Sequence, residues 1–90
     1  SVPSKIFEYA RLGLPILYFG GGEGEDMVRK FELGWTAKAG DYAALNNQIS
    51  KIKKEDLNAA LKEKIRKTAL KAFDFNTQLK KITNTLFLLP

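Results

Sequence analysis

The first apolar positions of the chain have helical spacing. Residues 5–12 place their apolar side chains on one side of a helical wheel and their polar side chains in a narrow stripe, which predicts a short helix with one buried face. Ser4 is a favourable N-cap before this segment, and Gly13 is a favourable stop after it. The buried face is formed by Ile6, Phe7 and Ala10.

The pattern then changes between strand and helix. Residues 14–19 form a continuous apolar run bounded by glycines, which is typical of a strand buried on both faces of a parallel sheet. Residues 23–31 predict a helix with acidic residues in its first turn, and residues 34–38 predict a second strand. A third helix is expected over residues 42–52, capped by residues 40–41. This order of elements predicts an α/β domain with a parallel sheet.

The second half of the chain is expected to be entirely helical. Apolar residues recur every three or four positions over residues 57–69 and again over residues 79–86, and residues 74–76 are expected to separate two helices. We therefore predict a single domain or part of one, with an α/β part over residues 1–53 and C-terminal helices over residues 54–90. Two strands are few for a sheet, which usually has about four to six. The sheet edge is therefore expected to pair with a partner or with upstream strands.

The polar stripe of the first helix offers a candidate anion site. If the helix starts at Ser4, the backbone amides of Ser4, Lys5 and Ile6 are open at its positive end, and the Lys5 side chain adds a cation. Glu8 follows one turn along the same stripe, where a carboxylate can accept hydrogen bonds from the two hydroxyls of a ribose. This spacing suits a nucleoside diphosphate. A solvated ion pair between Glu8 and Arg11 is the plain structural alternative.

Three consecutive glycines, Gly20, Gly21 and Gly22, follow the first predicted strand and form a candidate loop at the ligand cleft. A dinucleotide-binding fingerprint also begins with glycines after a strand, but Met27 occupies the position of its last glycine. We therefore expect a flexible strand-to-helix turn, with a contact to donor or acceptor as the less favoured alternative.

Composition narrows the chemistry that the chain can perform. Its 90 residues include neither cysteine nor histidine, which excludes internal disulfides, zinc sites of the usual kind and catalysis by thiolate or imidazole. We expect no metal and no other cofactor. The apolar runs at residues 14–19 and 86–89 are far shorter than the roughly 20 residues that span a bilayer.

The net charge of +5 is unevenly distributed along the chain. Residues 1–45 carry five basic and six acidic side chains, whereas residues 46–90 carry ten basic and four acidic ones. We expect the basic half to be the solvated outer face of amphipathic helices, and contact with anionic lipid head groups is a second interpretation. Nucleic-acid binding is not expected, because acidic residues are interleaved with the lysines and no nucleic-acid motif is present.

Residues 2–16 carry a more specific signal. Their sequence, Val-Pro-Ser-Lys-Ile-Phe-Glu-Tyr-Ala-Arg-Leu-Gly-Leu-Pro-Ile, resembles the Pro-Ser-Lys-x-x-Glu-Tyr segment of GT-B glycosyltransferases that use nucleotide-diphosphate sugars in capsule, O-antigen and exopolysaccharide assembly. The similarity continues through the triple glycine and through residues 34–45, and it covers nearly the whole chain. Outside the first segment the motifs are weak when taken alone.

The resemblance implies the C-terminal part of a Rossmann-like, donor-binding GT-B domain. Glu8 would then bind the donor ribose, and the start of the first helix, with Ser4, Lys5 and the amide of Ile6, would approach the donor diphosphate. It also implies a piece of a larger cytoplasmic enzyme, peripheral on the inner face of the membrane, whose N-terminal domain binds a glycan or lipid-linked acceptor. The piece alone is expected to be inactive, and its catalytic residues are left open. The alternative is a small basic, non-catalytic interaction module.

Overall fold

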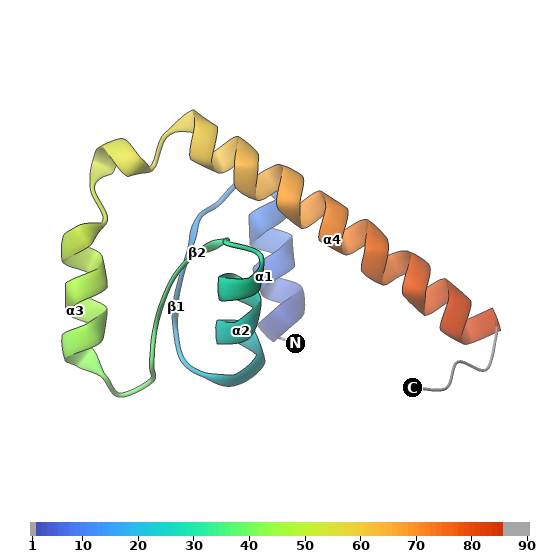
Figure 1. Ribbon diagram of the computed structural model, residues 1–90, viewed down its shortest axis with the longest axis horizontal. Coiled ribbons are helices and arrows are strands. Elements are labelled where there is room, and N and C mark those ends of the chain that lie inside the picture. Colours follow the sequence, from blue (N-terminus) through green and yellow to red (C-terminus); the bar gives the residue numbers. More distant parts are fainter. Residues whose placement is uncertain (1, 86–90) are drawn as a thin grey trace.

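The computed structural model describes residues 2–85, and the side chains of residues 4–72 and 74 (Figure 1). Residues 1 and 86–90 lie outside the described residues, and with them the apolar run at 86–89 and the end of the expected helical tail. The elements follow one another in the order α1 (Val2–Arg11), β1 (Ile16–Phe19), α2 (Gly22–Lys30), β2 (Gly34–Ala37), α3 (Tyr42–Lys51), the 3-10 helix η1 (Lys54–Asp56) and α4 (Ala59–Thr85).

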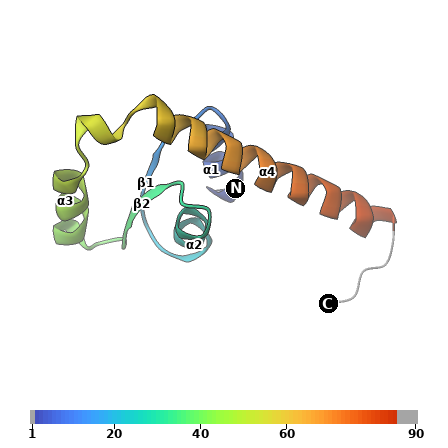
Figure 2. The ribbon, with the colours of Figure 1, turned by 45° about the horizontal axis from the view of Figure 1, so that its top comes forward.

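The two strands form a small parallel sheet with helices on both sides. β1 and β2 pair in the register that places Ile16 beside Gly34. Helices α1 and α2 lie on one side of the sheet and α3 lies on the other, an arrangement that Figures 1 and 2 show from two directions. A hydrogen bond of 3.0 Å from the Gln48 side chain to the Thr36 carbonyl joins α3 to β2. The predicted α/β class, with its alternation of helix and strand, is therefore confirmed.

The prediction that the first strand is buried on both faces is wrong. Ile16 and Tyr18 pack toward the core, but Leu17 keeps 39% and Phe19 36% of its surface exposed on the opposite side. Among the residues that the structure describes, α3 is the helix on that side, and it contacts β1 through the rings of Phe19 and Tyr42, whose centroids are 5.5 Å apart. The apolar run therefore forms a strand whose face toward α3 is only partly covered.

The apolar core lies between α1, α2 and α4. Helix α4 crosses α1 in both views (Figures 1 and 2). The rings of Phe7 and Phe31 meet at a centroid distance of 5.7 Å and close the core beside the turn between α2 and β2. The buried residues of this cluster are Ile6, Phe7, Ala10, Val28, Leu33, Ile65 and Ala69. The buried face expected for the first helix is confirmed.

Helix α1 ends where the sequence predicts. Gly13 has a φ of 78°, and its amide donates to the Ala10 carbonyl at 2.9 Å while the Leu14 amide donates to the Tyr9 carbonyl at 3.3 Å. This pair of bonds is a Schellman motif, which requires the left-handed conformation that glycine adopts without strain. A Cβ atom at Gly13 would lie 3.0 Å from the Lys62 carbonyl oxygen, so the turn after α1 packs directly on the backbone of α4.

Two helix boundaries differ from the sequence prediction. α1 begins at Val2, so Ser4 lies in its first turn and is not the N-cap. Proline favours this earlier start, because at residue 3 its fixed φ is already helical and its missing amide is not needed in the first turn. α4 continues through residues 74–76 where a break was expected. No glycine or proline occurs between residues 59 and 85, and the helix propensities of Asp and Asn are lower than that of Ala by only tenths of a kcal/mol.

Gly34→Ala is expected to destabilise the protein by about 2–3 kcal/mol. A Cβ atom at this position would overlap the Ile16 carbonyl oxygen, so the two strands would have to separate. Gly21→Ala is the matched control, because φ there is −131° and the nearest atom to the added Cβ is a Glu25 carboxylate oxygen at 3.8 Å. Urea unfolding followed by circular dichroism should show a loss below about 1 kcal/mol for the control. Equal losses in the two variants would contradict this account of the strand pairing.

Candidate functional site

The carboxyl ends of both strands and the starts of three helices meet at one end of the molecule. In Figure 1 β1 and β2 run toward this end, and α1, α2 and α3 all begin there. Backbone amides at the first turns of helices give such an end a positive partial charge. Ligands of open α/β sheets bind outside the carboxyl ends of the strands for this reason, and anionic ligands in particular.

The polar stripe predicted for α1 is exposed at this end. Ser4, Lys5 and Glu8 are all solvent-exposed, while Ile6 on the other side keeps only 4% of its surface accessible. Ion pairs within the described part of the chain join Glu25 to Arg29, Glu32 to Lys64 and Glu63 to Arg66. Lys5 and Glu8 take part in none of them. The expected alternative, an ion pair between Glu8 and Arg11, is therefore not formed.

The earlier helix start changes how the backbone can contribute to this site. In a helix that begins at Val2, the Ile6 amide donates to the Val2 carbonyl one turn back, so it does not point out of the helix end. The backbone amides of the first turn are then those of Val2 and Ser4, because Pro3 has no amide hydrogen, rather than those of residues 4–6. Ile6 contributes its side chain to the core. Lys5 acts at the surface through its ammonium group.

The glycines after β1 have a packing role that the sequence did not reveal. Gly20 and Gly24 are buried, and both lie against the ring of Tyr18. A Cβ atom at Gly24 would overlap this ring, and one at Gly20 would lie 3.0 Å from it. Gly22, with a φ of 69°, starts α2 and has no such neighbour. The glycines therefore let the chain fold closely around Tyr18, and the periodicity of the sequence contains no signal for this contact.

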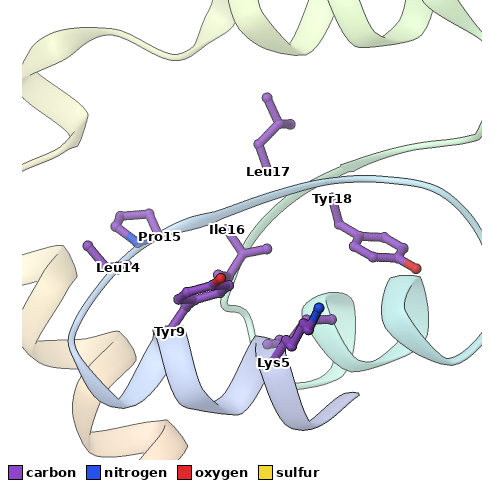
Figure 3. A pocket seen from close by; sticks show the side chains of 8 residues that line it. Lys5, Tyr9, Leu14, Pro15, Ile16, Leu17 and Tyr18 are labelled. Atoms are coloured by element: carbon purple, nitrogen blue, oxygen red, sulfur yellow. The ribbon is translucent and has the colours of Figure 1, made fainter. Parts of the chain in front are cut away.

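A pocket of about 510 Å³ lies between α1 and β1. Figure 3 shows Lys5 and Tyr18 at one end of it, Leu14 and Pro15 at the other, and Tyr9 beside Ile16 between them. The volume is in the range of small-molecule sites, and the lining is mostly apolar with one cation and two phenol groups. Tyr9 is 51% exposed although it lies in an amphipathic helix, and the sequence pattern predicted no ligand role for it. The sequence signal that could have identified Tyr9 is its position as an aromatic residue next to the predicted polar stripe.

The basic second half shows charge pairing on its surface. Arg66 donates two hydrogen bonds to the Glu63 carboxylate, of 2.6 and 2.8 Å, and these bonds lower the pKa of Glu63 and raise the pKa of Arg66. Lys64 pairs with Glu32, in the turn that follows α2, at 3.3 Å. All four side chains are at least partly exposed. In this part of α4 the prediction of a solvated outer helix face is consistent with the observed pairing.

Within the described residues, no helix has the length and apolar character needed to cross a membrane. In the same part of the chain, carboxylate side chains do not gather into a group able to hold a metal ion. Comparison with known proteins adds no assignment: no family model matches the chain, and neither the curated proteins nor the solved structures include a significant match.

Gly24→Ala is expected to destabilise the protein by about 1–3 kcal/mol, because the added methyl group displaces the Tyr18 ring. In a Tyr18→Leu background the same change should cost less than half as much, since the shorter side chain removes the overlap. Urea unfolding of the four proteins in this cycle measures the coupling. Gly22→Ala is the control, and its cost should be independent of residue 18. An equal cost of Gly24→Ala in both backgrounds would show that the glycine does not accommodate Tyr18.

Proposed function

We propose that this chain is the donor-nucleotide-binding part of a GT-B glycosyltransferase, which transfers a sugar from a nucleotide-diphosphate sugar to a glycan or lipid-linked acceptor in surface polysaccharide biosynthesis. The observation that carries the proposal is the exposed stripe of α1. Lys5 and Glu8 lie one turn apart, without ion-pair partners among the described residues, on a helix that begins at the carboxyl end of the sheet. The resemblance of residues 2–16 to the Pro-Ser-Lys-x-x-Glu-Tyr segment supports the same assignment.

In this proposal the two charged side chains hold different parts of the donor. Lys5 and the positive end of α1 bind the diphosphate and stabilise the negative charge that grows on it as the sugar departs. Glu8 accepts hydrogen bonds from the ribose hydroxyls. Three residues along an α-helix correspond to about 4.5 Å, which matches the separation of a ribose from the nearer phosphates. In this proposal Lys5 and the positive end of α1 stabilise the leaving diphosphate, so its departure needs no metal ion.

The rest of the reaction lies outside this chain in the proposal. The acceptor is bound by an N-terminal domain of a larger, cytoplasmic enzyme, and the Rossmann-like sheet has more strands than the two seen here. The basic second half adds a peripheral contact with anionic lipids when the acceptor is carried on a lipid. We assign no catalytic acid or base to residues 1–90, and we expect these residues alone to bind donor nucleotide weakly and to transfer no sugar.

Titration of the ¹⁵N-labelled chain with UDP, GDP and ADP tests the proposal. With the preferred nucleotide we expect millimolar affinity and chemical-shift changes centred on residues 4–8. Lys5→Gln and Glu8→Gln should each weaken binding by up to about fivefold, the effect of losing an exposed interaction of ~1 kcal/mol. Lys54→Gln and Glu55→Gln are charge-matched controls in η1, at the opposite end of the molecule in Figure 1, and should leave the affinity unchanged.

Two outcomes would contradict the proposed site. One is nucleotide-dependent shifts that centre on α4 or η1 and weaken equally in the control variants, which would indicate general attraction of an anion to a basic chain. The other is unchanged affinity in Glu8→Gln although shifts occur at residues 4–8, which would remove the ribose role while leaving the phosphate role of Lys5.

A further inference from the structure

The outer edge of β2, which faces away from β1, is bonded to a side chain of α3. The Leu33 and Ala37 carbonyls accept hydrogen bonds of 2.9 Å from the side of β1. Backbone groups alternate in direction along a strand, so the amide and the carbonyl of Thr36 point to the outer edge. There the Gln48 side-chain amide donates to the Thr36 carbonyl at 3.0 Å. A side chain thus takes the place that the backbone amide of a further strand would take.

Gln48 is a polar residue on the apolar side of α3. The half-buried positions of this helix are residues 44, 45 and 48, which lie on one side of it, and Ala44 and Leu45 are apolar. Asn47, in contrast, is exposed. Packing alone would favour an apolar residue at position 48. The amide at this position is explained by the hydrogen bond that it makes to the strand.

The same hydrogen bond holds the later part of α3 against the strand. At the first residue of the helix, the ring of Tyr42 meets the ring of Phe19 at a centroid distance of 5.5 Å. Gln48 lies six residues, or nearly two turns, further along the helix. These two contacts together fasten α3 beside β2 over most of the length of the helix. Loss of the second contact would let this part of α3 move away from the edge.

An uncovered outer edge of β2 would be complementary to itself. Open strand edges pair with further strands, and proteins prevent such pairing by covering the edge with a helix or a loop. In an antiparallel pair, two opposite residues can exchange both of their backbone hydrogen bonds. Thr36 presents its amide and its carbonyl to the same edge, so Thr36 of one copy can form such a pair with Thr36 of a second copy. The two copies would then be related by a two-fold axis.

We propose that Gln48 is a blocking contact, which prevents the outer edge of β2 from pairing with the same edge in a second copy of this chain. The Gln48 amide occupies the Thr36 carbonyl, which is the acceptor that the second copy needs. It also keeps α3 in the space that the second copy would enter. Loss of this side chain frees the acceptor and the space together, and the chain then forms a two-fold dimer through β2.

Gln48→Ala tests the proposal, because alanine keeps α3 helical and removes the donor. We expect its dimer in sedimentation equilibrium to be about tenfold tighter than any dimer of the unchanged chain, since two new backbone hydrogen bonds form in each dimer. Hydrogen exchange at the Thr36 amide should slow as the concentration of the variant rises. Asn47→Ala, at an exposed position of the same helix, is the matched control and should change neither measurement.

Two further variants separate the hydrogen bond from the packing. Gln48→Met fills a similar space without a donor, so it should dimerise as Gln48→Ala does. Gln48→Lys keeps a donor and adds a charge at the edge, so it should behave as the unchanged chain does. Circular dichroism of each variant checks that the helix content is retained. The samples contain no nucleotide, so the result does not depend on donor binding.

Three results would overturn the proposal. The first is a Gln48→Ala chain whose sedimentation and Thr36 exchange do not change with concentration up to the millimolar range. The second is a Gln48→Met chain that stays monomeric while Gln48→Ala dimerises, which would show that bulk and not the hydrogen bond protects the edge. The third is a dimer that forms equally in the unchanged chain and slows exchange at Leu17 but not at Thr36. Self-association would then use the edge of β1.

Discussion

The burial of α1 against α4 is the contact on which the rest of the structure depends. A sheet of two four-residue strands cannot enclose a core, and one of its faces is only partly covered. Ile65 and Ala69 of α4 are fully buried and form the wall opposite Ile6 and Ala10. Without α4, part of the apolar side of α1 would face water, and only the contacts with α2 and β1 would fix which side of this helix points to solvent.

The direction of the polar stripe follows from that burial. Because one side of α1 is held in the core, Lys5 and Glu8 have to face solvent at the carboxyl end of the sheet. The same end is shaped by the close approach of Gly24 to Tyr18, which keeps the start of α2 near the end of β1. The site thus combines an orientation set by core packing with a loop shape set by one aromatic side chain.

Features with a local cause could be predicted from the sequence. Gly13 ends α1 in a left-handed turn, and Asp41 caps α3 by accepting a 2.9 Å hydrogen bond from the Ala44 amide. The alternation of helices and strands over residues 2–51 followed from the apolar pattern and the glycines that bound it, and the exposed position of Glu8 followed from helical periodicity. The start of α1 was missed because Ser4 is as suitable for a first turn as for a cap, and the proline before it favoured the longer helix.

Features that arise between elements could not be predicted in this way. The exposure of Leu17 depends on how much of the sheet α3 covers, and the pocket beside Tyr9 depends on the distance between α1 and β1. The spacing of apolar residues along the chain determines neither the cover that α3 gives the sheet nor the distance between α1 and β1. The continuity of α4 through residues 74–76 shows a related limit, since residues with weak helix propensity do not stop a long helix unless glycine or proline accompanies them.

The direct packing of Gly13 on the Lys62 backbone affects how a movement of α1 passes to α4. No side chain lies between the turn after α1 and α4, so the two helices meet through a contact with little capacity to deform. α4 has 27 residues and is therefore about 40 Å long, and its contact with α1 lies in its first half. A rotation of α1 by about 5° transmitted through this contact would move the far end of α4 by about 3 Å. A bound molecule that tilts α1 would thus displace the distal end of α4 by a larger distance, because α4 would pivot about its contact with Gly13.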